Sequence, residues 1–188
     1  QEQRRIGETR YNIEEPAMYT EYQIMAVDKN GVAGFASEPF VVYNTKYEQR
    51  FDISNYTTNY VNGYEYMGNK AVEISASKNT RIEMNVEVPE TGHYVIDLRY
   101  VNGSETATGG NTCAIRTLLV NNKRAGVIVF PNRGANAWHT WGFSNSVAVN
   151  LNKGTNTIAL ILDSTSVNMN GDGINKAILN YARLIRVE

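Results

Sequence analysis

The sequence predicts an all-β protein whose main part is an antiparallel β-sandwich of jelly-roll type. From Tyr47 onward, about nine short strand-like runs follow one another, separated by Gly, Asn and Pro turns. No stretch keeps the apolar period of an α-helix over three turns. Charged residues make up only 20% of the chain, while Tyr, Asn, Thr and Gly are frequent, and this composition is typical of β-rich domains.

The first segment, "MYTEYQIMAVDKNGVAGFASEPFVVYN", predicts a β-hairpin. Tyr22, Ile24 and Ala26 alternate with polar neighbours, "DKNG" provides a turn, and "EPFVVY" provides a second strand. About 45 residues cannot close a sandwich alone, because a lone hairpin is only marginally stable in water. We therefore expect a partial β-domain over residues 1–45 and a complete sandwich over residues 46–188.

The runs that build the second domain are "YEQRFDI", "AVEISA", "TRIEMNVEVP", "HYVIDLRYV", "AIRTLLVN", "RAGVIVF", "SVAVNLN", "TNTIALILD" and "AILNYARLIRV". Residues two apart on a strand share one face, so the apolar alternation identifies the buried side. The residues that this alternation predicts for the core are Ile96, Leu98, Val149, Leu151, Ile158 and Leu160.

Charge and reactive side chains argue against several classes of function. A net charge of −1 without a basic cluster gives no reason to expect nucleic acid or an anionic membrane as partner. Cys113 is the single cysteine and only two histidines accompany it, so neither a disulfide nor a zinc motif is expected. No apolar run reaches the ~18 residues of a membrane span. The N-terminal "QEQRRIGETR" lacks the apolar centre of a signal peptide, so secretion would require a signal upstream.

The arrangement that nucleophilic catalysis requires is also missing from the sequence. His93 stands at the start of a predicted strand, His139 stands between the two tryptophans, and there is no Gly-x-Ser-x-Gly motif. Glycoside hydrolysis needs two carboxylates about 5 to 10 Å apart, and the sequence alone leaves such a pair open among its 19 acidic residues. Acidic residues such as Glu73, Glu83 and Glu87 alternate along strands, as on a solvated strand face. We therefore expect a chain that is not itself an enzyme.

The string "YTEYQIMAVDKNGVAGFAS" combines a tyrosine, alternating apolar residues, "AVD", a Gly turn and a Ser-rich bend. In this order it resembles the last strands of a fibronectin type III domain. The resemblance implies a spacer module and covers about the first quarter of the chain.

Four motifs of the later part occur together: "VPETGHYVIDLRYVNG", "GANAWHTWG", "VAVNLNKGTNTIAL" and "LNYARLIRV". In order and spacing they are similar to carbohydrate-binding modules of families six and thirty-five. The resemblance spans about Tyr47 to Glu188. It implies a galactose-binding-like jelly roll that is attached to a polysaccharide-degrading enzyme and binds sugar through loops at one end.

The resemblance implies different roles for the two tryptophans. In such modules the first tryptophan is the sugar platform and the second points inward, so Trp138 is the binding candidate and Trp141 a core residue. Sugars stack their C–H faces on exposed aromatic rings. Tyr64 and Tyr66, which share a face if their segment is extended, are the candidates to oppose Trp138. The alternative, that both tryptophans are packing residues, stays open because tryptophan is highly buried on average.

Asparagines are the expected polar partners of the sugar. Asn102 ends the "RYVNG" strand, where these modules often carry an Asn beside the cleft, although Asn before Gly is also a turn signal. Before the last strand the family carries another Asn and an Asp, but this chain has Ile178 and Asn180 there. Asn175 or Asp172 would have to substitute for the missing side chain.

A structural calcium ion is the one cofactor that the resemblance implies. Family members often hold it with two glutamates of the first strand. This chain keeps Glu48 but has Arg50 in the second position, and a cation is electrostatically unfavourable in a calcium shell. The string "NMNGDG" over residues 168–173 resembles the start of an EF-hand loop, yet Leu179 stands at its twelfth position, so we interpret it as a glycine turn.

Together these observations predict a non-catalytic module of a larger secreted, cell-surface or periplasmic glycan-degrading protein. Its expected partners are a polysaccharide or oligosaccharide and the catalytic domain of the parent enzyme, with no nucleic acid and no membrane. The alternative hypothesis is a structural or interaction sandwich that binds no sugar. An exposed Trp138 beside an open cleft favours the first hypothesis, whereas a buried Trp138 favours the second. The sequence does not identify the glycan.

Overall fold

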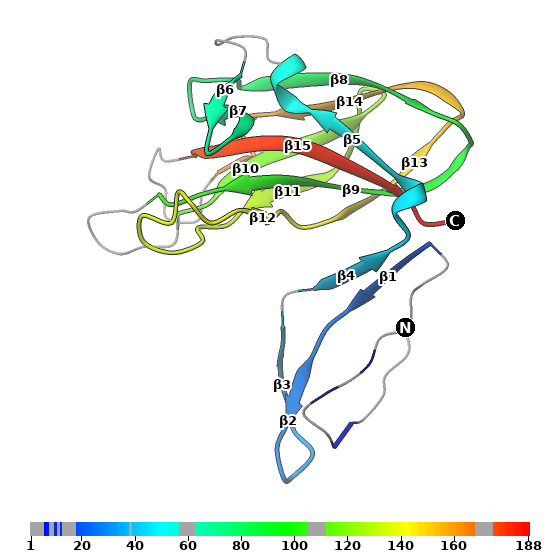
Figure 1. Cartoon of the computed structure of the whole chain (residues 1–188), viewed down its shortest axis with the longest axis vertical. Coiled ribbons are helices and arrows are strands. Elements are labelled where there is room, and N and C mark those ends of the chain that lie inside the picture. The colour runs from blue at the N-terminus through cyan, green and yellow to red at the C-terminus, as the bar shows by residue number, and fades with distance from the viewer. Residues whose placement is uncertain are drawn as a thin grey trace. The chain divides into compact units, whose positions relative to one another are not determined.

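A computed structural model describes residues 6–7, 10, 12, 18–37, 39–56, 63–104, 112–167 and 175–188 (Figure 1). The chain forms two compact units, Gln1–Tyr47 and Glu48–Glu188. In the described residues there is no α-helix, and the two short helices, η1 (Thr45–Tyr47) and η2 (Ile53–Asn55), are of the 3₁₀ type. Neither of them is of a length and apolarity that would allow it to cross a membrane.

The first unit contains an antiparallel hairpin that is bent into two short sheets. Strand β1 (Tyr19–Tyr22) pairs with β4 (Phe40–Tyr43), and β2 (Met25–Val27) pairs with β3 (Ala33–Ala36). The turn follows the predicted "DKNG": the Asp28 carboxylate accepts hydrogen bonds from the backbone N–H groups of Asn30 at 2.8 Å and Val32 at 2.9 Å. Gly31 adopts the positive φ that favours glycine. The likeness of this unit to fibronectin type III strands stays a prediction.

The second unit consists of two antiparallel sheets (Figure 1). One sheet has four strands in the order β11-β10-β14-β8, and the other has seven strands. The larger sheet runs β12-β9-β15-β7-β6, and in addition β13 pairs with β9 and β5 with β15. The strands are β5 (Glu48–Asp52), β6 (Tyr64–Tyr66), β7 (Asn69–Ile74), β8 (Arg81–Val88), β9 (Gly92–Val101), β10 (Ala114–Val120), β11 (Lys123–Phe130), β12 (Gly142–Phe143), β13 (Val147–Leu151), β14 (Gly154–Ile161) and β15 (Ala177–Arg186).

The main core lies between these two sheets, because side chains of both form one buried cluster. Strand β8 shows the rule: its residues alternate strictly between exposed and buried, with Ile82 and Met84 among those inside. The six residues that the alternation predicts for the core, Ile96, Leu98, Val149, Leu151, Ile158 and Leu160, are all buried in this cluster. The predicted antiparallel β-sandwich is therefore confirmed.

A side-chain amide joins the two sheets at one margin. The backbone N–H of Val129, on β11, donates to Asn145 Oδ1 at 2.7 Å, and Asn145 Nδ2 donates to the Val127 carbonyl oxygen at 2.9 Å. Asn145 precedes β13 of the other sheet, so its amide takes the place of a neighbouring strand beside β11. This pairing satisfies backbone groups that an open sheet edge would leave unpaired.

We expect residues 48–188 to fold without residues 1–47, because within the described residues nothing before Phe51 belongs to the main core cluster or packs against it. In a thermal melt followed by circular dichroism, the shortened chain should melt within about 4 °C of the full chain, the shift that about 1 kcal/mol produces in a domain of this size. Leu98→Ala in the shortened chain is the sensitivity control, since deletion of a buried leucine costs about 2 to 5 kcal/mol. A shortened chain without a cooperative melt would contradict the domain boundary.

Candidate functional site

A second, smaller apolar cluster lies on the outer face of the seven-stranded sheet. The alternation along β9 places it there, because Tyr100 belongs to the main core whereas Val101 belongs to the small cluster. Its members are the buried Ala71, Val101 and Ile178, against which the partly buried Tyr66, Trp138 and Trp141 pack. Strands β6, β7, β9 and β15 and the loop 131–141 thus meet at one end of the second unit (Figure 1).

Loop 131–141 is held by the segment that follows β9. The Asn102 side chain is fully buried and donates through Nδ2 to the carbonyl oxygens of Phe130 at 2.9 Å and Thr112 at 3.3 Å. Its Oδ1 accepts from the Ser104 backbone N–H at 3.0 Å, and its carbonyl oxygen accepts from the Arg133 N–H at 2.9 Å. Through its side-chain amide and its backbone carbonyl, Asn102 therefore links the end of β9 to the end of β11, to the start of the tryptophan loop and to the segment before β10.

Backbone contacts fix the position of Trp138 within this loop. Its N–H donates to the Asn136 carbonyl oxygen at 2.8 Å, and the Ala137 N–H donates to the Gly134 carbonyl oxygen at 3.1 Å. Gly103 packs directly beneath, since a Cβ on Gly103 would lie 2.6 Å from the backbone nitrogens of both Ala137 and Trp138. The absence of a side chain at residue 103 is what allows the loop to approach β9 this closely.

The tyrosines of β6 lie beside the tryptophans, but they differ in their surroundings. The Tyr66 hydroxyl donates to the Trp138 carbonyl oxygen at 2.8 Å, and its ring meets the Trp141 ring edge-to-face at 6.2 Å between centroids. Tyr64 is more exposed and meets Tyr66 edge-to-face at 6.0 Å. Tyr66 therefore supports the loop, while Tyr64 presents surface to solvent.

Both tryptophans are partly buried, and each has a cation over its ring. The Lys176 ammonium lies 5.1 Å from the Trp138 ring centroid, and the Arg99 guanidinium lies 4.4 Å from that of Trp141. Trp141 was expected in the core, but it packs against the small outer cluster instead. On the inner side, Tyr100 and Phe130 meet edge-to-face at 5.3 Å as members of the main core.

Asn175, predicted as a sugar ligand, is buried and bonded within the protein. Its Oδ1 accepts from Arg116 Nη1 at 2.6 Å and from the Ile115 N–H at 2.9 Å, and its Nδ2 donates to the Ser166 carbonyl oxygen at 2.8 Å. Arg116 is also buried, and burial lowers the pKa of its guanidinium to about 10. Like Asn102, Asn175 holds segments of the protein together in this structure, and neither side chain faces solvent.

The remaining predicted site residues fall elsewhere. Asp172, with the whole of residues 168–174, lies outside the described residues. Glu48, on β5, forms an ion pair with Arg50. No group of three His, Cys, Asp or Glu side chains suited to a metal ion occurs in the described part of the chain. The Glu48 carboxylate, the predicted calcium ligand, is paired with the cation of Arg50, and a cation is electrostatically unfavourable beside a calcium ion.

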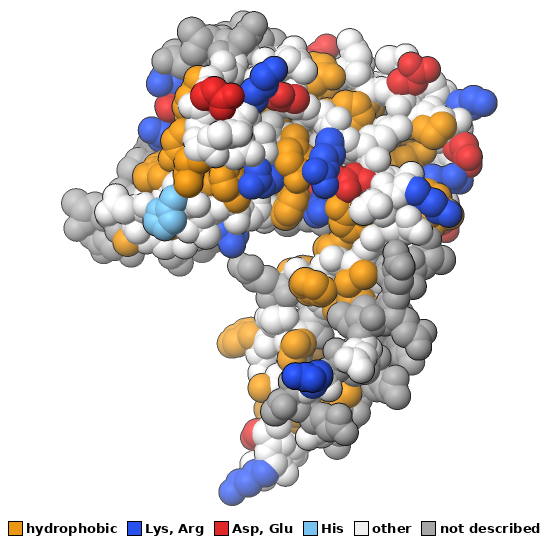
Figure 2. All heavy atoms as spheres, in the orientation of Figure 1, with side chains coloured by type: hydrophobic (Ala, Val, Ile, Leu, Met, Phe, Trp, Pro, Cys, Tyr) orange, Lys and Arg blue, Asp and Glu red, His pale blue; other side chains and the backbone are white. Residues whose placement is uncertain are grey.

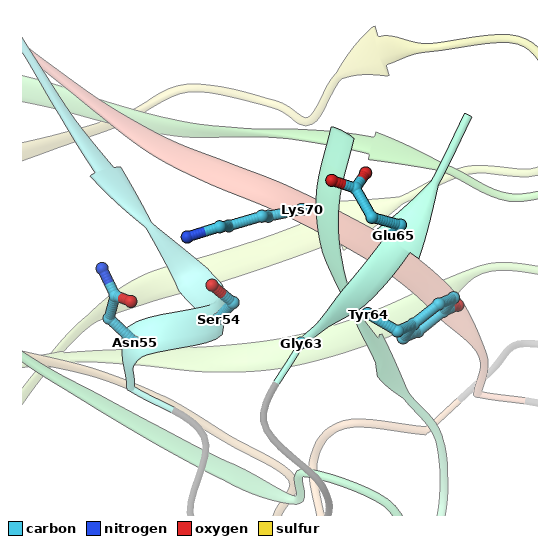
Figure 3. A pocket seen from close by; sticks show the side chains of 6 residues that line it. All are labelled: Ser54, Asn55, Gly63, Tyr64, Glu65 and Lys70. Carbon is cyan, nitrogen blue, oxygen red and sulfur yellow. The ribbon is translucent and has the colours of Figure 1, made fainter. Parts of the chain in front are cut away.

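An open hollow of about 470 Å³ lies beside this region. It is lined by Ser54, Asn55, Gly63, Tyr64, Glu65 and Lys70, and Figure 3 shows Lys70 extended toward the η2 residues. Trp138 does not line this hollow. On the face of the second unit in Figure 2, hydrophobic side chains alternate with those of Lys and Arg.

Comparisons with known proteins relate this chain to a glucosyltransferase, a glucanotransferase and carbohydrate-binding modules. No family model matches the chain. A 1,6-alpha-glucosyltransferase of Sporosarcina globispora is 33% identical over 138 residues, which make up 71% of this chain and 10% of that protein. This chain therefore corresponds to only a small part of the length of that relative.

Solved structures identify the fold. A family 35 carbohydrate-binding module from Clostridium thermocellum is 23% identical, with a TM-score of 0.50 over 73% of this chain and 96% of that chain. The second unit has the jelly-roll fold of the family 35 carbohydrate-binding modules. The resemblance predicted from the sequence is thus confirmed at the level of the fold. A Paenibacillus cycloisomaltooligosaccharide glucanotransferase, solved with cycloisomaltoheptaose, is 25% identical, with a TM-score of 0.54 over 71% of this chain and 18% of that chain.

Gly103→Ala should displace loop 131–141, because the new Cβ would collide with backbone atoms that cannot move independently of the loop. We expect a loss of about 1 to 3 kcal/mol in the free energy of unfolding and a changed tryptophan emission spectrum, since both tryptophans of the chain lie in this loop. Gly34→Ala is the matched control, because a Cβ there meets only the Ala26 carbonyl oxygen at 3.6 Å. Equal behaviour of the two variants in urea unfolding would contradict the proposed packing.

Proposed function

We propose that residues 48–188 form a non-catalytic module that binds α-1,6-linked glucan and belongs to a larger secreted glucan-active enzyme. The fold supports carbohydrate binding, because the modules that share it bind carbohydrate. The linkage is suggested by two enzymes that parts of this chain resemble, a 1,6-alpha-glucosyltransferase and a glucanotransferase solved with cycloisomaltoheptaose. Isomaltooligosaccharides are chains of α-1,6-linked glucose units, so both names indicate the same ligand chemistry.

The observation that carries the proposal is the aromatic cluster at one end of the sandwich. Trp138 and Trp141 lie with Tyr64 and Tyr66 on the outer face of the seven-stranded sheet, and no other tryptophan exists in the chain. A pyranose ring gains affinity when its C–H face stacks on such a ring. Within the cluster, Trp138 is the proposed platform, and Tyr64 is the proposed second contact because it is exposed.

The polar contacts of the proposed site differ from those that the resemblance implies. Because the amides of Asn102 and Asn175 are bonded internally, hydroxyl groups of the sugar would have to meet other side chains. His139, in the loop, and Tyr64, on β6, are exposed, and both can donate and accept hydrogen bonds. A neutral glucan fits this set, since it requires hydrogen-bonding groups but no compensating charge.

The non-catalytic role is supported by the surroundings of two carboxylates of the seven-stranded sheet, Asp97 on β9 and Glu73 on β7. Asp97 is buried and binds Arg183 through two hydrogen bonds of 2.9 and 2.5 Å. Burial raises the pKa of the Asp97 carboxyl, although the hydrogen bonds and charge of Arg183 act in the opposite direction. Glu73 lies between Lys78 and Lys176. These carboxylates are engaged in ion pairs, an arrangement that suits structure better than proton transfer to a glycosidic oxygen.

A second candidate function is a structural or interaction sandwich without sugar affinity. An exposed Trp138 would favour the sugar-binding module, and a buried Trp138 would favour the structural sandwich. Trp138 is partly buried and Lys176 lies over its ring, so its exposure alone does not decide between the two. A calcium ion bound through Glu48 stays a prediction from the resemblance, and the ion pair with Arg50 argues against it.

Affinity electrophoresis in native gels that contain dextran, an α-1,6-linked glucan, tests the proposal. The parent chain should be retarded, and Trp138→Ala should lose about tenfold or more in affinity, because a stacked ring contributes about 0.5 to 1.5 kcal/mol beyond its contact area. Phe143→Ala is the matched control, since Phe143 is an exposed aromatic residue of the same sheet outside the loop. Far-UV circular dichroism should show that both variants are folded.

Two results would decide against the glucan. If xylan or mannan gels retard the parent chain but dextran gels do not, the ligand is another polysaccharide and not α-1,6-linked glucan. If none of these gels retards it, the structural sandwich is favoured. Unchanged retardation of Trp138→Ala would remove the platform role from this residue.

A further inference from the structure

The ammonium group of Lys176 lies over the Trp138 ring, where a sugar would stack. Lys176 immediately precedes β15, and its ammonium nitrogen lies 5.1 Å from the Trp138 ring centroid. The indole itself packs against the small cluster of Ala71, Val101 and Ile178. The protein thus contacts Trp138 from the sheet, and a charged side chain lies over its ring.

This geometry conflicts with a sugar on the same face of the indole. Carbon atoms in contact lie about 3.5 to 4.0 Å apart, so a stacked pyranose fills the layer directly above the ring. An ammonium group over the ring and 5.1 Å from its centroid lies within the space that the stacked sugar ring and its substituents would fill. The lysine and the sugar therefore cannot occupy this face of Trp138 at the same time.

A neighbouring carboxylate gives Lys176 a second partner. Lys176 Nζ lies 3.6 Å from Glu73 Oε2, and Lys78 Nζ lies 3.0 Å from Glu73 Oε1. Strand β7 carries Glu73 next to β15, with Glu73 opposite Ile178 in the register. The Lys176 side chain is 41% exposed. In the part of the chain that the structure describes, its ammonium group contacts the Trp138 ring and the Glu73 carboxylate. Exposed ion pairs are weak, and a long lysine side chain moves readily.

We propose that Lys176 is a displaceable cover of Trp138, which a bound sugar must push off the indole. Glu73 receives the ammonium group when the cover opens, so the charge keeps a partner in both states. The identity of the sugar rests on the proposed function, but the cover is a property of the free protein. The affinity of the site is consequently lowered by the free energy that holds Lys176 on the ring.

The cover can be tested without any sugar. In protein labelled with 5-fluorotryptophan, ¹⁹F NMR should show two resonances, which Trp138→Phe assigns. Lys176→Ala should shift the Trp138 resonance and increase its solvent isotope shift between H₂O and D₂O, while the Trp141 resonance stays unchanged. Lys78→Ala is the matched control, because it removes the other cation that pairs with Glu73. An unchanged Trp138 resonance in Lys176→Ala would overturn the proposal.

Calorimetry with isomaltoheptaose tests the competition. Lys176→Ala should bind about two- to fivefold more tightly than the parent, which is the factor that an exposed cation–π contact is worth. Lys176→Arg should bind no more tightly than the parent, since arginine also stacks on the ring, and Lys78→Ala should bind as the parent does. Weaker or equal binding by Lys176→Ala refutes the competition. If neither the parent nor Lys176→Ala binds, yet the NMR change occurs, the cover stands and the glucan proposal fails.

Discussion

The hydrogen bonds of buried Asn102, through its side-chain amide and its backbone carbonyl, are the interactions on which the tryptophan loop depends. Its hydrogen bonds satisfy the Phe130 and Thr112 carbonyl oxygens and the Ser104 N–H, three backbone groups from separate segments. An unpaired buried polar group costs about 1 to 3 kcal/mol, so loss of this side chain would leave several groups unsatisfied at once. Gly103 then allows the loop to lie against the end of β9. The position of Trp138 is therefore determined by polar bonds beneath the surface.

This support determines which face of the sheet can carry a ligand. The inner face is filled by the main core, in which Tyr100 and Phe130 already meet edge-to-face. Both tryptophans consequently lie on the outer face, where Tyr66 bonds the Trp138 carbonyl oxygen and packs against Trp141. The aromatic surface and the core are thus two sides of the same strand alternation, and a change of register in β9 would exchange them.

The sequence was sufficient for the core and insufficient for the polar part of the site, for a physical reason. Alternation is a local property, so the buried faces of β9, β13 and β14 could be predicted from neighbouring residues alone. The role of an asparagine depends on partners that are distant in sequence. Asn102 bonds a carbonyl 28 residues away and Asn175 a guanidinium 59 residues away. A carboxamide that binds loop carbonyls has the same sequence signature as one that binds sugar hydroxyls.

A cation lies over each tryptophan ring, but the two cations are held with different strength. Arg99 lies over Trp141 and donates to the Asn69 and Asn180 side-chain oxygens at 3.1 and 2.7 Å, and its planar guanidinium loses little freedom by stacking. Lys176 lies over Trp138 with one carboxylate at 3.6 Å. The cation on Trp141 is thus part of a hydrogen-bonded network, whereas the cation on Trp138 is held loosely. A ligand can replace the second at small cost but not the first, and this difference divides the pair into a supporting ring and an accessible one.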